Sequence, residues 1–183
     1  MKFAENRKLA WIVLVVCVLF SLSFSSERAL ANLRLQVETV FVSGAHNDGL
    51  CINNDLKERA ENAYNIASTA SNYSAVDSAL VQAARDASNA LASAETISEK
   101  YAANVACQKA VEDLYTAVEN TTISETDRSF ILNQYKEFQS RADTIKRDHY
   151  NQRAMEYNSV LDQFPANLLA RLARIDKLEL FDS

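Results

Sequence analysis

Glycine is absent from Leu50 to the end of the chain, and Pro165 is the only proline. Glycine supplies the positive φ angles of tight turns and proline interrupts helices, so these two residue types limit where a backbone turns. Residues of high helix propensity, such as alanine, leucine and glutamate, are frequent in the same stretch. The sequence therefore predicts an all-α fold, and 183 residues suffice for one domain with a substantial core.

The first 31 residues have the order of an export signal. Basic residues precede an apolar run from Leu9 to Phe24, and the segment ends in the small residues of an Ala-Leu-Ala sequence. This order predicts a signal peptide cleaved before Asn32. An uncleaved single-pass membrane anchor is the alternative, although 16 apolar residues span only about 24 Å as a helix, less than the ~30 Å of a bilayer core. In either case we expect residues 32–183 outside the cytoplasm.

The charge of the exported part argues against nucleic acid as a partner. Removal of residues 1–31 leaves 15 of the 19 basic residues and 22 of the 24 acidic ones, a net charge of −7. Nucleic-acid binding relies on a basic face that releases counterions. We expect no nucleic-acid partner, and membrane contact through the N-terminal segment if it is uncleaved. Binding to anionic lipid is otherwise disfavoured, except at the basic segment after Pro165.

Residues 32–52 are predicted to form an extended N-terminal arm. Leu33, Leu35 and Val37 alternate with polar residues, which is the period of an extended chain. Residues 53–183 are predicted to form the helical domain.

Within that domain, apolar residues recur every three or four positions, which predicts an up-down antiparallel bundle of about four helices. The predicted ranges are approximately 54–72, 74–94, 96–120 and 124–164. An amphipathic helix is expected after Pro165. We favour that it folds back to cover the end of its own bundle; the alternative is a position on a membrane surface or on a partner.

Cys51 and Cys107 remain once the leader, which contains Cys17, is set aside. An even pair of cysteines in an exported protein favours a disulfide, and the predicted bundle places both toward the same end. We predict a Cys51–Cys107 disulfide. The alternative is two separate thiols, one of them in the core.

No arrangement of residues predicts an enzyme. His46 and His149 are the only histidines, and neither stands in a recognised nucleophile or metal-binding spacing. Acidic residues are interpreted as lying on solvated helix faces, among basic residues such as Arg59 and Lys109. A glycine-rich phosphate loop is also missing from the sequence. We predict a non-enzymatic protein with no cofactor and no metal.

Two Tyr-Asn pairs form the most specific pattern in the chain. Tyr150-Asn151 and Tyr157-Asn158 would occupy nearly one face of a helix, because seven residues make about two turns. Their rings can line one groove while the hydroxyls reach polar partners. We interpret the repeat as a packing signature, with the apolar residues from Leu178 to Phe181 anchoring the terminus.

The residues around this repeat resemble the carboxyl-terminal signature of the LemA family. The resemblance lies in Lys146 to Asn151, in Tyr157-Asn158, in Phe164-Pro165-Ala166-Asn167 and in the hydrophobic end of the chain. It extends over about residues 53–183. LemA-like proteins are bacterial and have an amino-terminal hydrophobic segment followed by a helical bundle outside the cytoplasm. The family has no established catalytic activity.

Two departures indicate a divergent, exported branch: the helix at 54–72 only partly matches the family's arginine-rich opening helix, and Arg171 to Ile175 replaces a usual Gly-Phe turn. We therefore expect a non-enzymatic protein of the bacterial cell envelope that acts through contacts with envelope or extracellular proteins. The alternative is a secreted helical module that binds a ligand or a surface.

Overall fold

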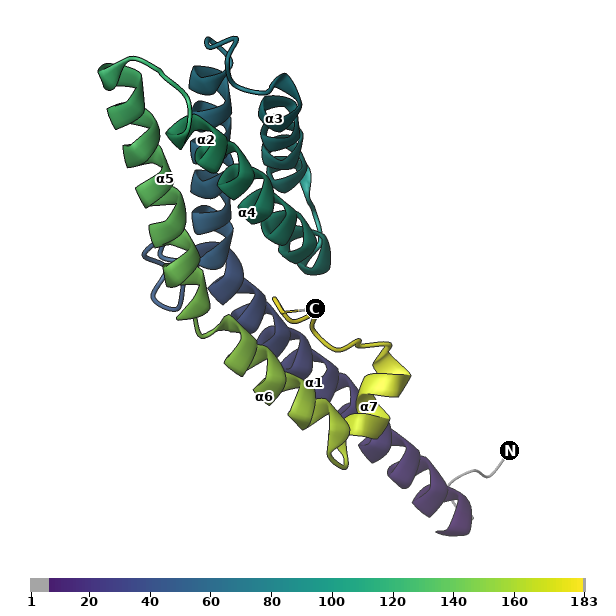
Figure 1. Ribbon diagram of the computed structural model, residues 1–183. Helices are drawn as coiled ribbons and strands as arrows, with labels where there is room; N and C mark the ends of the chain where they lie inside the picture. Colours follow the sequence, from purple (N-terminus) through teal and green to yellow (C-terminus); the bar gives the residue numbers. More distant parts are fainter. Residues whose placement is uncertain (1–6, 183) are drawn as a thin grey trace. The chain divides into compact units, whose positions relative to one another are not determined.

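The computed structural model describes residues 7–182, and the regular secondary structure in this range is entirely helical, which confirms the predicted all-α class. Seven helices occur among the described residues (Figure 1). One precedes the predicted bundle and one follows Pro165, and between them there are five helices where about four were predicted. The bounds of all seven are α1 Arg7–Ser43, α2 Ile52–Ala70, α3 Ser78–Ser93, α4 Ile97–Glu119, α5 Glu125–Lys146, α6 Tyr150–Asp162 and α7 Ala166–Ala173.

The chain divides into two compact units. One, which we name the α7 unit, comprises Met1–Val37 and Ala154–Leu178. The other, the bundle unit, comprises Glu38–Arg153 and Glu179–Ser183. Helices α1 and α6 therefore contribute residues to both units, and this division differs from the predicted boundary at residue 53.

Helix α2 is the central element of the bundle unit. It packs against α3 and α5, and α4 packs against α2 and α3 (Figure 1). Small residues on α2 let the neighbouring axes approach closely; the fully buried ones are Ala63, Ala67 and Ala70. Ser88 of α3 donates its buried hydroxyl to the carbonyl oxygen of Ala60 at 2.8 Å, which satisfies a polar side chain inside this tight contact.

Capping side chains begin three of the bundle helices. Asp77, Thr96 and Ser124 each accept a backbone N–H from the first turn of α3, α4 and α5, respectively. Such caps satisfy amide groups that have no partner within the helix. The predicted starts near residues 96 and 124 are confirmed. The helix predicted from residue 74 starts only at Ser78, because Asp77 is its cap.

The predicted extended arm at residues 32–52 is wrong. Helix α1 continues to Ser43, and a turn with Gly44 and Gly49 at positive φ leads into α2. The buried side chains of this part of α1 are spaced as one face of a helix; they are Leu30, Val37, Val40 and Phe41. The alternation that begins at Leu33 was too short to outweigh that helical spacing.

Two helices replace the single helix predicted at 124–164. Helix α5 ends at Lys146, and α6 begins at Tyr150. Asp148 accepts the backbone N–H of Tyr150 at 2.7 Å, so its carboxylate starts a new helix as a cap. Helical periodicity on both sides of Asp148 concealed this start signal in the sequence.

In the α7 unit, a turn with a cis Phe164–Pro165 peptide joins α6 to α7. Ala170 of α7 is buried, but Leu168 and Leu172 are exposed. We favoured a helix that folds back and so buries its apolar face. That expectation is wrong for Leu168 and Leu172, which stay exposed. The hydrophobic end of the chain behaves as predicted, because Leu178 and Phe181 are buried in their respective units.

The predicted leader lies at the start of α1. Its first six residues are outside the described residues, and the apolar run from Leu9 to Phe24 is part of the helix. Within the described part of the chain, no helix combines the length and the hydropathy that crossing a membrane requires.

Candidate functional site

A cavity of about 800 Å³ lies in the bundle unit, and residues of α2, α4, α5 and the start of α6 line it. We name it the Arg59 cavity. Its size falls in the range of small-molecule and peptide sites. The wall from α4 includes Asn104, Gln108 and Glu112, and the wall from α5 includes Gln139.

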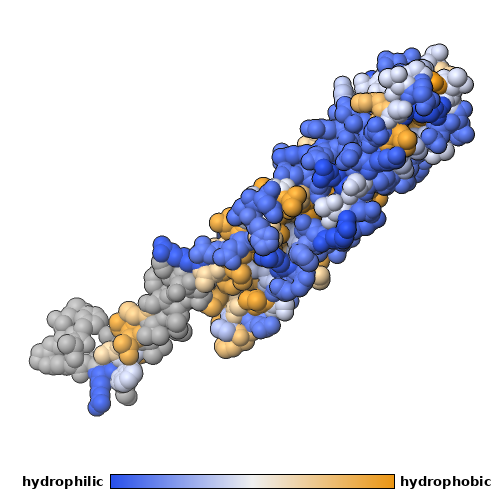
Figure 2. Space-filling model, turned by 90° about the vertical axis from the view of Figure 1, so that its left-hand side faces the viewer, coloured by the Kyte–Doolittle hydropathy of each residue, from blue (hydrophilic) through white to orange (hydrophobic). Residues whose placement is uncertain are grey.

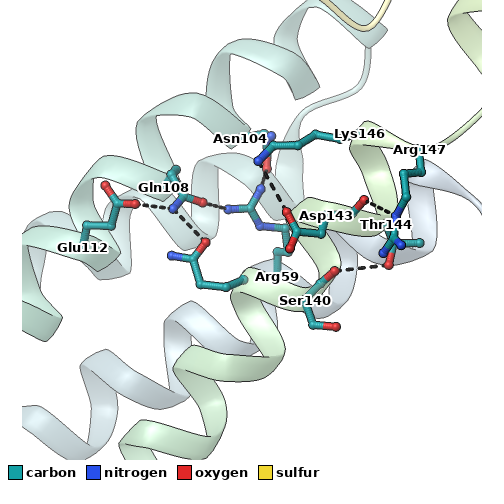
Figure 3. A network of polar contacts seen from close by, with 10 residues as sticks. Arg59, Asn104, Gln108, Glu112, Ser140, Asp143, Thr144, Lys146 and Arg147 are labelled. Carbon is teal, nitrogen blue, oxygen red and sulfur yellow. Dashed lines mark hydrogen bonds and ion pairs between the residues drawn. The ribbon is translucent and has the colours of Figure 1, made fainter.

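Arg59 is the largest fully buried side chain of the described residues and is only 2% exposed. Its guanidinium carbon lies 4.0 Å from the ring centroid of Phe138 on α5. The guanidinium donates hydrogen bonds to the side-chain oxygens of Asn104 and Gln108 on α4 (Figure 3). Its Nε has no hydrogen-bond partner among the described residues. Amides and an aromatic ring, rather than a carboxylate, thus hold this buried cation.

Burial shifts the pKa values of Arg59 and of neighbouring Cys107 in the direction that favours the neutral form of each group. Burial lowers the pKa of Arg59 to about 10, and nearby acidic groups oppose the shift. Burial raises the pKa of the Cys107 thiol to about 11, and Arg59 opposes that shift. At neutral pH Arg59 is therefore still a cation and Cys107 is a neutral thiol, which is a poor nucleophile.

Carboxamide side chains continue along the cavity wall. Gln108, which accepts from Arg59, donates to Gln139 across the cavity at 3.1 Å. It also donates to Glu112 one turn further along α4 (Figure 3). A carboxamide carries both a donor and an acceptor, the same pair that a peptide backbone presents. This wall therefore suits a ligand that offers backbone amides.

Asn151, which also lines the cavity, already binds a backbone in this way. Its Nδ2 donates to the carbonyl oxygen of Phe181 at 3.2 Å, and its Oδ1 accepts the N–H of Phe181 at 2.7 Å. The hydroxyl of Tyr150 donates to the carbonyl oxygen of Glu179 at 2.7 Å. The ring of Phe181 meets that of Tyr101 edge-on, with 5.4 Å between centroids. Side chains thus hold the end of the chain as a sheet would hold a strand.

The same pairing occurs in the α7 unit. Asn158 donates to the carbonyl oxygen of Leu178 at 2.9 Å and accepts its N–H at 2.8 Å. Tyr157, which precedes Asn158, is buried. Tyr150-Asn151 and Tyr157-Asn158 thus each correspond to one backbone pairing with the C-terminal segment.

The remaining signature residues have a different environment. Phe164, Pro165 and Asn167 are all exposed, and Pro165 stands at the N-cap position of α7. They mark the turn between two helices.

The predicted Cys51–Cys107 disulfide is wrong, because both residues are free, buried thiols. Cys51 precedes α2, and its Sγ donates to the carbonyl oxygen of Val42 at the end of α1, at 3.1 Å. Cys107 is fully buried on α4 beside Arg59. The continuation of α1 to Ser43 gives Cys51 a partner that the extended-arm prediction did not contain. The alternative of two separate thiols describes the structure.

Both histidines, His46 and His149, are exposed. Among the residues that the structure describes, no three His, Cys, Asp or Glu side chains gather closely enough to hold a metal ion. A buried carboxylate does occur in the bundle unit: Asp55, 6% exposed, lies 3.4 Å from Arg141. Burial raises the pKa of Asp55, and Arg141 opposes the shift. This pair joins α2 to α5.

The sequence interpretation missed Arg59, which it assigned to a solvated face. The available signal was its position: Arg59 directly precedes Ala60 and follows Leu56 by three residues, which places it at the edge of the apolar face of α2. The carboxamides on α4 and α5 had no comparable signal, because polar residues on amphipathic helices are usually solvated.

The LemA family model matches residues 50–183 of the chain, a range that contains every residue lining the Arg59 cavity. No curated protein matches the chain significantly, and no solved structure does.

Proposed function

This chain belongs to the LemA family, and from this premise we propose that it is a non-enzymatic helical-bundle protein exported to the bacterial cell envelope. It acts there through protein contacts, and the Arg59 cavity binds an extended segment of a partner protein. The observation that carries the proposal is the pairing of Asn151, a cavity residue, with both backbone polar groups of Phe181.

The chemistry of the cavity supports an extended segment as the ligand. Peptide backbones are recognised where paired donors and acceptors face them, and side-chain pockets then add specificity. Asn104 and Gln139 each have one amide nitrogen that donates to no other described residue in the structure. Val105, 51% exposed, offers apolar contact on the same wall.

Charges in the cavity support recognition through the backbone rather than through a particular charge. The lining contains Lys109 and Lys146 but also Glu112 and Asp148. Lys109 and Lys146 each have an acidic partner on their own helix, at 2.7 and 3.5 Å. Arg59 is the remaining lining cation, and its guanidinium is already bound by Asn104 and Gln108. The other lining charges are of both signs, so they select no single sign of ligand.

The same lining supports a non-enzymatic role. Its residues, all within the described part of the chain, include no histidine and no cysteine, and the thiol of Cys107, which neighbours Arg59, is neutral at neutral pH. Nucleophilic catalysis needs a nucleophile held against a base, and the cavity walls offer amides instead.

Site-specific photo-crosslinking in the native host tests the binding site. A photoreactive residue replaces Val105 in the cavity, and a matched variant carries it at Phe130, which is 42% exposed in the same unit but outside the cavity. We expect protein adducts from Val105 that are missing from Phe130 and that weaken when Asn104→Ala and Gln139→Ala are added. Identical adduct patterns at the two positions would contradict the proposal.

Mass spectrometry of the protein recovered from its host tests export and separates the two modes of attachment. An N-terminus at Asn32 identifies a cleaved leader and a secreted protein, which is the alternative of a secreted helical module that binds a ligand or a surface. An intact leader in the membrane fraction identifies the anchored form. Recovery of the full chain from the cytoplasm contradicts export altogether.

A further inference from the structure

Large apolar side chains are uncovered along one side of the α6–α7 corner. Phe164 is 82% exposed, Leu168 53% and Leu172 69%. They follow one another at intervals of four residues, so those on α7 share a face. The face shown in Figure 2 carries hydrophobic patches among a mainly hydrophilic surface. Uncovered apolar clusters of this kind mark contact surfaces.

Basic residues accompany this apolar face. Arg171 and Arg174 are exposed at the end of α7, and the helix contains no acidic residue. Arg171 stands three residues after Leu168, which places it beside the leucines of α7. Apolar side chains flanked by arginine are suited to a membrane interface. The arginines would meet lipid phosphates while the leucines enter the boundary of the acyl chains.

The α7 unit also fixes where this helix lies along α1. Arg34 of α1 donates to the carbonyl oxygen of Asp176, just after α7, at 3.0 Å. The apolar run of α1 ends at Phe24, which is ten residues, or about 15 Å of helix, before Arg34. Figure 1 shows the N-terminal half of α1 continuing past α7. Along α1, the apolar run therefore comes first, and the part of α1 that contacts the segment after α7 follows it.

We propose that Phe164, Leu168 and Leu172 form a membrane-contact face that docks on an anionic lipid surface, with Arg171 and Arg174 binding the headgroup phosphates. The proposal rests on export in the sense given above, since it requires a membrane beside residues 9–24. It requires neither that α1 cross the bilayer nor that the Arg59 cavity bind a protein.

A tryptophan reporter in the full chain tests the membrane-contact face directly. The substitution Trp11→Phe removes the only tryptophan of the chain. Leu172→Trp then places a single fluorescent reporter on α7. The matched control is Phe130→Trp in the same background. With vesicles of phosphatidylcholine and phosphatidylglycerol, we expect a blue-shifted emission for Leu172→Trp and at least about twofold stronger quenching by brominated acyl chains than for the control.

The arginines are tested in the same system. Arg171→Gln with Arg174→Gln should reduce quenching on anionic vesicles and leave the weaker signal on pure phosphatidylcholine unchanged. If the Leu172→Trp reporter stays open to aqueous iodide and unaffected by brominated lipid, the proposal is overturned, even when the leader holds the protein on the vesicle. Shielding from iodide without lipid, increasing with protein concentration, would instead identify a second copy as the occupant and would also overturn it. Crosslinking at Val105 tests the Arg59 cavity independently of the vesicle experiment. A failure of the cavity proposal can therefore be distinguished from a failure of the membrane-contact proposal.

Discussion

Asn151 exchanges two hydrogen bonds with the backbone of Phe181, accepting the N–H at 2.7 Å and donating to the carbonyl oxygen at 3.2 Å. A carboxamide is the smallest side chain that offers a donor and an acceptor side by side. The C-terminal residues are thus held in extended form by a helix, with no second strand required.

Asn151→Ala should release the C-terminal residues of the bundle unit. It leaves both backbone groups of Phe181 without their partners, and we expect a loss of about 1–2 kcal/mol in the free energy of unfolding. Hydrogen exchange at the Phe181 amide, followed by NMR, should accelerate in this variant. Asn151→Asp keeps the acceptor but loses the donor, so its effect should be intermediate.

Asn167→Ala is the matched control, because Asn167 is an exposed asparagine on α7. Its effect on stability should stay within about 0.5 kcal/mol. Unchanged exchange at Phe181 in Asn151→Ala would show that the ring of Phe181 and the Tyr150–Glu179 hydrogen bond hold the segment without Asn151.

The Tyr-Asn repeat shows how far sequence reasoning reaches. The spacing of Asn151 and Asn158 correctly placed both on one helix, and the predicted polar partner of a tyrosine hydroxyl is confirmed for Tyr150. The partner segment was not predictable in detail. It lies 20 to 30 residues away, and a backbone group carries no residue identity that a sequence pattern could reveal.

The errors of the sequence interpretation have a common physical origin. The arm at residues 32–52 and the disulfide were argued from local patterns, whereas Phe41 and Cys51 adopt their positions through contacts between helices. Tertiary packing overrides a six-residue alternation, since the buried face of α1 is decided by what covers it. The helices of the bundle unit were predictable because their apolar periodicity is long and capped.

Arg59→Met should destabilise the bundle unit. It retains an unbranched apolar side chain but removes the donors that Asn104 and Gln108 accept and the contact with Phe138. The two half-buried acceptors are then left without this partner, and we expect a loss of about 1–3 kcal/mol in the free energy of unfolding, measured by urea unfolding. Arg59→Lys should also lose stability, because a single ammonium group does not reproduce the planar fork.

Lys109→Met is the control for Arg59, since Lys109 is exposed on α4 and its removal should leave the unfolding midpoint unchanged. Equal or higher stability of Arg59→Met would mean that desolvation of the guanidinium outweighs the whole network. In that case the amide wall would be positioned by α4 and α5 alone.

Alkaline pH should weaken the fold through the buried Cys107 thiol. Its pKa is raised from 9.0 to about 11, so above about pH 9 the unfolded chain loses this proton while the folded chain keeps it. Fewer protons bound to the unfolded state mean that stability falls as pH rises. The expected contribution is a loss of about 1 kcal/mol between about pH 8 and pH 10.

Arg59 acts in the opposite direction at higher pH. Its folded-state pKa of about 10 lies below the unfolded value, so its desolvation cost is relieved as pH rises through 10 and above. Below about pH 9 Arg59 is still almost fully protonated in the folded chain, so the decline in stability there comes from the thiols. Cys107→Ala should have a flatter pH dependence than the native chain in urea titrations, and parallel curves would refute the assignment. Burial also raises the pKa of Cys51. The stability of Cys107→Ala should therefore still decrease somewhat with rising pH, through Cys51.

The stacked rings of Tyr115 and Tyr135 should couple α4 to α5 beyond the end of the Arg59 cavity. Their centroids lie 3.9 Å apart with 6° between the ring planes, and Tyr115 stands three residues after Glu112, a lining residue. A double-mutant cycle with Tyr115→Ala and Tyr135→Ala should give a coupling of about 0.5–1.5 kcal/mol. Tyr115→Phe is the matched control and should keep most of the coupling energy, because the ring remains.

The same alanine variants should lower the yield of adducts from Val105, since α4 and α5 lose a contact that sets the width of the cavity. A coupling near zero would mean that α2, which packs against both helices, positions the two walls without the stack.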